Sequence, residues 1–201
     1  LFEDIRNAEH DILGVGVQSI LLVEDSVRYY STYLPELYRM VLRQSAEFLK
    51  ETLNEQQRKH MKRSRPKIRL TTNQDDAMAM YEKYKSNLLG VISDVGFCEH
   101  RGGKPEEEKL DAGIELVRHI KADDPKMPIL LQSSQDCISA VAEELGVGFL
   151  RKYSKTLMIQ LYEYIKEEFA FGDFIFRDAD RVEYGRAANL KELEILMREV
   201  P

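Results

Sequence analysis

Short apolar runs alternate with longer amphipathic segments along most of this chain. The runs are nearly continuous in Val, Ile and Leu, which predicts strands that are buried on both faces. They cover about residues 17–23, 67–72, 88–93, 128–132 and 147–151. The segments between them carry apolar residues at helical spacing. These cover about residues 26–62, 74–86, 112–121, 136–145 and 155–169. Parallel strands need crossover connections, so the alternation predicts an α/β fold with a five-stranded parallel sheet.

Local signals set several boundaries of these elements. Ser26 and Asn73 stand where a side-chain oxygen can cap the start of a helix. Pro35 lacks the amide donor that a helix interior requires, so we expect it to kink or restart the long first helix. Residues 2–11 have a helical pattern of their own, and residues 96–109 form a long polar loop.

The pattern changes after Ala170. Residues 171–177 and 181–185 alternate between apolar and polar positions on either side of a turn at 178–180, which predicts a β-hairpin. A short amphipathic helix over 190–197 follows. We expect this appendage to stay outside the parallel sheet. The predicted organisation is an N-terminal helix and linker at 1–17, a five-stranded domain at 18–170, and a hairpin-plus-helix extension toward a next domain at 171–201.

Composition narrows the class of protein. The chain has 201 residues, is 43% hydrophobic and carries a formal net charge of -6. No apolar stretch approaches the roughly 18 residues that a membrane span needs. Cys98 and Cys137 form no ligand-spaced pair, which favours a reduced, cytoplasmic protein. Net acidity argues against nucleic acid as the main partner, and we interpret the basic run 58–65 as a solvated helix end. The chain begins at Leu1, so we interpret it as a piece of a longer protein.

Polar side chains follow four of the predicted strands. Glu24 and Asp25 come after the first strand, Asp94 after the third, Ser133 after the fourth and Lys152 after the fifth. The carboxyl ends of parallel strands line one crevice, where ligands bind. Three carboxylates, a hydroxyl and an ammonium in one crevice predict that an aspartate is phosphorylated there with the help of a divalent cation.

Each of these groups suits one part of that reaction. Asp94 is the expected nucleophile toward a phosphoryl donor. Lys152 is expected to neutralise one phosphoryl oxygen and Ser133 to hydrogen-bond another. Mg²⁺ takes oxygen ligands in octahedral geometry. Its expected ligands are the carboxylates of Asp25 and Asp94 and the carbonyl of Gly96, with Glu24 acting through water.

With these residues in this order, the chain resembles a response-regulator receiver (CheY-like) domain over about residues 18–168. Receivers carry an acid pair, a phosphoacceptor Asp, a Ser or Thr, and a Lys after strands one, three, four and five. The resemblance implies a flavodoxin-like, doubly wound sheet of strand order 2-1-3-4-5. It implies that Phe149 is a switch residue that moves with Ser133. It also implies phosphorelay signalling with a sensor histidine kinase or phosphotransfer protein, and it leaves homodimerisation open.

Three features depart from the receiver pattern. Tyr153 stands where receivers usually carry a proline after the lysine, which affects how Lys152 is presented. Asp25 and Asp94 lie 69 positions apart (94 minus 25), beyond the family's usual spacing, and the excess falls in the first helix and its connection. The loop after Asp94 is also long.

The flanking segments carry a narrower resemblance, to the receiver region of large bacterial proteins related to phosphoenolpyruvate synthase and pyruvate phosphate dikinase. The resembling segments are residues 20–30, 91–95, 171–177 and 190–194. This resemblance implies that the domain regulates a phosphotransferase part and contacts neighbouring domains of its parent chain. No residue here would carry pyruvate chemistry, so we expect no enzymatic activity beyond phosphorylation and dephosphorylation of the chain's own aspartate.

Three other functions remain open. A pseudo-receiver would act only as a protein–protein scaffold, and Tyr153 favours it. An aspartate-nucleophile phosphatase ranks lower, because Gly96 occupies the place of a general-acid Asp two residues after the nucleophile. A nucleotide-binding Rossmann domain ranks lowest, because the glycine pair at 14–16 precedes the first strand, whereas the fingerprint follows it.

Overall fold

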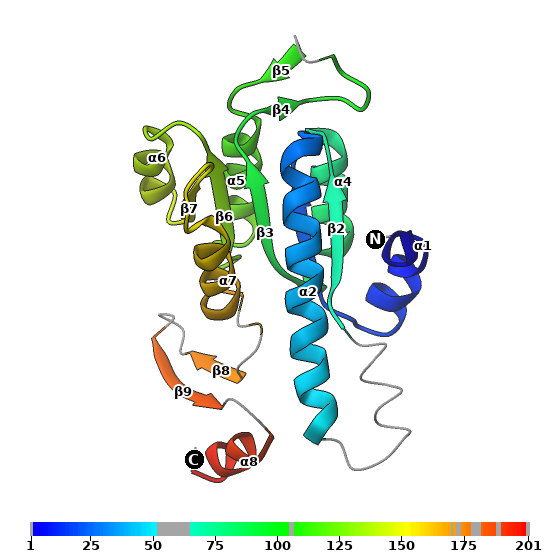
Figure 1. Ribbon diagram of the computed structural model, residues 1–201, viewed down its shortest axis with the longest axis vertical. Coiled ribbons are helices and arrows are strands. Elements are labelled where there is room, and N and C mark those ends of the chain that lie inside the picture. Colours follow the sequence, from blue (N-terminus) through cyan, green and yellow to red (C-terminus); the bar gives the residue numbers. More distant parts are fainter. Residues whose placement is uncertain are drawn as a thin grey trace.

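The computed structural model describes residues 2–51, 65–104, 107–169, 171, 174–177, 182–187 and 190–199. A parallel sheet of five strands forms its centre, in the order β2-β1-β3-β6-β7 (Figure 1). The strands are β1 (Ser19–Val23), β2 (Lys67–Thr71), β3 (Leu88–Asp94), β6 (Ile129–Ser133) and β7 (Gly148–Arg151). Counted along the chain, this is the predicted order 2-1-3-4-5. The expectation of a flavodoxin-like, doubly wound fold is therefore confirmed.

Helices cover both faces of the sheet, which explains why the central strands β1, β3 and β6 are mostly apolar on both faces. One face packs against α2 (Val27–Glu51) and α7 (Leu157–Glu167). The other packs against α4 (Gln74–Tyr84), α5 (Ala112–Asp123) and α6 (Ile138–Glu144). Successive side chains of β1 alternate between the two cores, as strand geometry requires. Ile20 and Leu22 belong to the α2 and α7 core, and Leu21 and Val23 to the opposite one.

The long helix α2 runs without a break through Pro35, so the expected restart there is wrong. Proline has no N–H, so Pro35 cannot donate the usual helix hydrogen bond to the Ser31 carbonyl. Pro35 and Ser31 are both exposed, and water can hydrogen-bond to this carbonyl instead. Tyr33 and Leu37 are buried on the opposite side, where packing against the sheet holds the helix together. None of the helices in the described part of the chain is long and apolar enough to cross a membrane.

Two other local predictions have different outcomes. Asn73 caps α4 as predicted, because its side-chain oxygen accepts a hydrogen bond of 2.9 Å from the backbone N–H of Asp76. The segment 96–109 is not a plain loop. It contains a short antiparallel pair, β4 (Phe97–Cys98) and β5 (Glu108–Lys109), and Phe97 is completely buried. The polarity of the segment hid this hairpin from the sequence analysis.

The N-terminal segment lies beside the edge strand β2. It consists of α1 (Phe2–Ala8) and a turn of π-helix, η1 (Glu9–Gly14). Ala8 and Ile12 are buried against Tyr84 of α4. The segment therefore covers part of the sheet edge, a place where unpaired strands are otherwise open to other chains.

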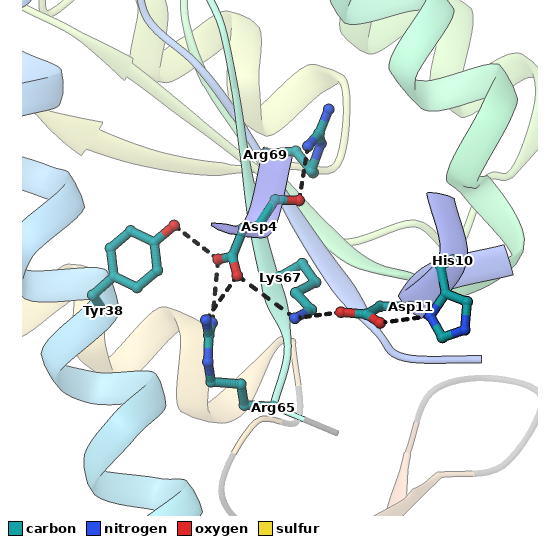
Figure 2. Close-up of polar contacts among 7 residues, drawn as sticks. All are labelled: Asp4, His10, Asp11, Tyr38, Arg65, Lys67 and Arg69. Atoms are coloured by element: carbon teal, nitrogen blue, oxygen red, sulfur yellow. Dashed lines mark hydrogen bonds and ion pairs between the residues drawn. The ribbon is translucent and has the colours of Figure 1, made fainter. Parts of the chain in front are cut away.

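A buried charge network fixes this segment (Figure 2). Asp4 is fully buried and accepts two hydrogen bonds from Arg65 and one from the Tyr38 hydroxyl. Lys67 lies 3.6 Å from Asp4 and 2.7 Å from Asp11. Burial acts to raise the pKa of Asp4, but the bonds from Arg65 and Tyr38 and the two nearby cations hold that pKa below its ordinary value. Residues 58–64 of the predicted basic run lie outside the described residues.

The described strands after residue 170 do not join the parallel sheet, as predicted. β8 (Phe174–Arg177) and β9 (Glu183–Ala187) pair antiparallel in a sheet of their own, followed by α8 (Leu190–Glu199). Arg186 of β9 donates a hydrogen bond to Glu167 of α7, which ties this appendage to the domain. The expected turn at 178–180 lies outside the described residues, and the domain boundaries remain predictions.

Replacing Asp4 tests the charge network. Asp4→Asn removes the buried negative charge that faces Arg65 and Lys67, and we expect it to lower the free energy of unfolding by about 3 kcal/mol at neutral pH. Because the pKa of Asp4 is lowered in the folded state, its contribution is present above the ordinary carboxyl pKa and is lost as pH falls below it. Urea unfolding at several pH values measures both effects.

The matched control is Glu9→Gln on the same segment, since Glu9 forms an exposed ion pair with Lys83. Its unfolding curve should nearly overlay that of the unchanged protein. Equal losses from Asp4→Asn and Glu9→Gln would contradict a stabilising role for the buried network.

Candidate functional site

The sheet brings the predicted polar side chains to one crevice. Asp94 ends β3, and Val23 of β1 pairs with Ser93, so Glu24 lies level with Asp94. Ser133 ends β6 and pairs with Arg151, which places Lys152 just past the end of β7. One crevice is lined by these strand ends and by the hairpin. Its lining includes Asp25, Asp94, Gly96, Glu108, Ser133, Lys152, Tyr29 and Tyr153.

Lys152 is the centre of the charges in this crevice. Its Nζ lies 2.5 Å from Oδ2 of Asp94 and 2.8 Å from Oε2 of Glu24. Lys152 is 5% exposed and Glu24 is 1% exposed, so this ion pair is formed almost out of water. The Lys152 ammonium also lies 4.0 Å from the centre of the Tyr29 ring, a cation–π contact. Lys152 therefore forms ion pairs with both carboxylates at once.

The carboxylates in this crevice repel one another. Burial and the charge of Asp94 raise the pKa of Glu24 to about 7, while Lys152 acts in the opposite direction. Burial also raises the pKa of Asp25, and the charges of Glu108 and Asp94 add to the rise. One ammonium does not balance all of these carboxylates, so a further cation would relieve the repulsion.

The residues present fit a divalent cation. Glu24, Asp25 and Asp94 each offer an oxygen, and these oxygens lie within 4.8 Å of one another. Glu24 is only 1% exposed, whereas Asp25 and Asp94 are partly buried and line the crevice. Asp25, Asp94 and the carbonyl of Gly96 are therefore the groups that could bind the ion directly, as an oxygen-seeking cation such as Mg²⁺ requires.

The backbone around Asp94 is held by close packing. The Gly113 N–H of α5 donates a 2.9 Å hydrogen bond to the Val95 carbonyl. A Cβ at position 113 would lie 2.0 Å from the Asp94 carbonyl oxygen, so only glycine permits this approach. The Asp94 carboxylate itself accepts a 2.7 Å hydrogen bond from the Val95 N–H. The position of the expected nucleophile thus follows from the contact of α5 with the end of β3.

Tyr153, which replaces the usual proline, has an unusual backbone conformation. Its φ is 69°, the left-handed region that residues other than glycine rarely adopt. Its ring meets Tyr29 edge to face at 5.7 Å, and the Arg28 guanidinium lies 5.9 Å from its centre. The backbone N–H of Lys152 donates a 2.9 Å bond to the Ser133 carbonyl, so the strand ladder presents the lysine without a proline.

The two expected switch residues lie in different surroundings. The Ser133 side chain lines the crevice and accepts a hydrogen bond from the Gln135 N–H. Phe149 is partly buried and packs against the core formed with α4, α5 and α6. Their roles in a switch remain predictions.

One crevice residue was missed by the sequence analysis. Glu108 lies on β5, and the hairpin returns it to Gly96, so that a Cβ at position 96 would lie 2.5 Å from its Oε1. Nothing in the acidic run around residue 108 distinguishes this carboxylate from its neighbours. Only the pairing of β5 with β4 singles it out.

No family model and no curated protein matches this chain. Similar solved structures include a response regulator receiver domain protein from Clostridium thermocellum, with 17% identity, a TM-score of 0.48, and coverage of 77% of this chain and 95% of that one. Vibrio cholerae chemotaxis protein CheY4 has 15% identity and a TM-score of 0.48, and the match covers 76% of this chain and 98% of that one. The Mn²⁺-bound response regulator Rcp1 has 19% identity and a TM-score of 0.43, with coverage of 74% of this chain and 91% of that one. The assignment of the fold rests on this chain's own strand order.

The raised pKa of Glu24 predicts a dependence of stability on pH. In the unfolded chain this carboxyl group titrates near its ordinary value of 4.5, whereas in the folded protein it titrates at about 7. The folded state therefore binds more protons between these values, and stability should fall as pH rises from about 4.5 to about 7. Glu24→Gln should flatten this decline, as measured by urea unfolding in metal-free buffer.

The control is Glu163→Gln, which removes an exposed carboxylate from α7. It should keep the decline of the unchanged protein. Parallel stability curves for Glu24→Gln and the unchanged protein would show that Glu24 does not hold the extra proton.

Proposed function

We propose that this chain is a phosphorelay receiver that accepts a phosphoryl group on Asp94. The observation that supports this most strongly is the contact of the Asp94 carboxylate with Lys152 inside a cluster of three carboxylates. A nucleophilic aspartate needs a fixed position and nearby positive charge, because both it and the donor are anions. This crevice supplies both through its own residues and through the cation that they fit.

Each side chain has a role in the transfer. An oxygen of Asp94 bonds to phosphorus while the bond between phosphorus and the donor's leaving group breaks. Lys152 stays beside Asp94 and neutralises a transferred oxygen, and the Ser133 hydroxyl hydrogen-bonds another. Asp25, Asp94 and the Gly96 carbonyl would hold Mg²⁺, with Glu24 acting through water. The bound cation supplies the positive charge that offsets the repulsion between carboxylate and phosphoryl group.

The proposed partners follow from this role and from the resemblance of the sequence. A sensor histidine kinase or phosphotransfer protein donates the phosphoryl group in the cytoplasm. The signal is passed through Ser133 and Phe149 to neighbouring domains of a parent chain related to phosphoenolpyruvate synthase. The hairpin and α8, which lie outside the parallel sheet, are the part of this chain that we assign to contacts with those domains.

A scaffold that is never phosphorylated is the alternative, and one observation favours it. Tyr153 directly follows Lys152 at the place where receivers usually carry a proline, and its backbone lies in the left-handed region. The two functions differ in whether Asp94 reacts.

Phosphorylation itself separates these functions. Incubation with acetyl phosphate and Mg²⁺ should add one phosphoryl group, seen by intact mass spectrometry. Asp94→Asn should abolish the addition, because it removes the nucleophile while keeping the shape of the side chain. Absence of labelling in the unchanged protein, at several donor concentrations, would support the scaffold instead.

Metal binding gives a second test of the same site. Asp25→Asn should weaken Mg²⁺ binding, measured by calorimetry, by about tenfold or more, because it removes a proposed direct ligand. Glu144→Gln removes an exposed carboxylate from α6 and should leave the affinity unchanged. Equal affinities for Asp25→Asn and the unchanged protein would exclude Asp25 as a ligand.

A further inference from the structure

The hairpin formed by β4 and β5 brings an additional carboxylate to the mouth of the crevice. Glu108 lines the same crevice as Asp25, Asp94 and Lys152. Glu108 is thus close to the reacting groups although it is 14 positions after Asp94 in the chain (108 minus 94).

Glycine at position 96 makes room for this carboxylate. A Cβ at position 96 would lie 2.5 Å from Oε1 of Glu108, well inside van der Waals contact. A carboxylate therefore lies beside position 96, two residues after the expected nucleophile. In an aspartate-nucleophile phosphatase the residue at that position is itself an Asp, whereas here the hairpin brings Glu108 to the same place.

Two other acidic groups of the crevice, Glu24 and Asp94, have partners within the protein. Glu24 is bonded to Ser26 and Lys152, and Asp94 to Lys152 and Val95. Glu108, by contrast, forms no ion pair within the described ranges of the chain, and it is exposed to solvent. A free carboxylate with access to water can accept a hydrogen bond from a water molecule and hold it beside the crevice.

We propose that Glu108 orients the water that hydrolyses the phosphoryl group on Asp94, and so sets the lifetime of the phosphorylated state. This inference rests on the proposed function. The water oxygen bonds to phosphorus as the bond between phosphorus and the Asp94 oxygen breaks. The electron pair returns to Asp94 as a carboxylate, and both water protons leave with the product as dihydrogen phosphate. Glu108 gains no proton, and its hydrogen bond fixes the direction of attack.

The test measures the decay of the phosphorylated protein. The chain is labelled with acetyl phosphate at saturating Mg²⁺, the donor is removed, and loss of the phosphoryl group is followed by intact mass. Glu108→Gln should lengthen the half-life by about tenfold or more, since its amide orients water less well. Gly96→Ala should lengthen it as well, because the added methyl group displaces the Glu108 side chain.

The charge-matched control is Glu99→Gln, which removes an exposed carboxylate just after β4 in the same hairpin. It should decay at the rate of the unchanged protein. A half-life that Glu108→Gln leaves unchanged, or that Glu99→Gln lengthens equally, would overturn the assignment. A change in Mg²⁺ affinity alone, without a longer half-life at saturating Mg²⁺, would overturn it too.

Failure of the proposed function gives a different result. If the unchanged protein is never labelled, the receiver function and this inference fall together. If it is labelled and Glu108→Gln decays normally, only this inference fails. Circular dichroism of each variant shows whether the fold is retained, and Glu108→Ala provides a second removal of the carboxylate.

Discussion

The crevice depends on the ion pair that Lys152 forms with both Glu24 and Asp94. The lysine extends from the end of β7 past β6 to the ends of β3 and β1, a span that its long flexible side chain permits. Burying an ammonium is unfavourable unless it is paired, so these three groups hold one another in place. Their alignment requires that three parallel strands end at the same level. The charge chemistry of the site is therefore a consequence of the register of the sheet.

The surrounding structure keeps that register. Alternate residues of the central strands pack into the two cores, so a shift of one residue would exchange the side chains that each core is packed around. Gly113 brings α5 into backbone contact with the end of β3, which fixes Asp94. The charge network around Asp4 anchors the N-terminal segment at the far edge of the sheet, remote from the chemistry. We assign this network a structural role, whereas the charges at Lys152 would also serve the proposed phosphoryl transfer.

Much of the fold and part of the site could be predicted from the sequence. Apolar runs that end in acids, a hydroxyl and an ammonium identified the five strands and placed Glu24, Asp25, Asp94, Ser133 and Lys152 in one crevice. Contacts between distant segments could not be predicted, because no local pattern encodes them. Glu108 reaches the crevice only through the pairing of β5 with β4, and Asp4 meets its cations only once the N-terminal segment docks. Pro35 does not restart the helix, because packing against the sheet holds α2 together where propensity alone would end it.

Chemical trapping of the phosphorylated residue can show whether Asp94 accepts a phosphoryl group in this crevice with the help of a divalent cation. Borohydride reduces an aspartyl phosphate to homoserine, and peptide mass spectrometry locates the reduced residue. After incubation with acetyl phosphate, the account predicts homoserine at position 94 alone, formed with Mg²⁺ and not in the presence of a chelator. Reduction at Asp25 or Glu24, a stable phosphate on Ser133, or labelling that is independent of the cation would contradict it.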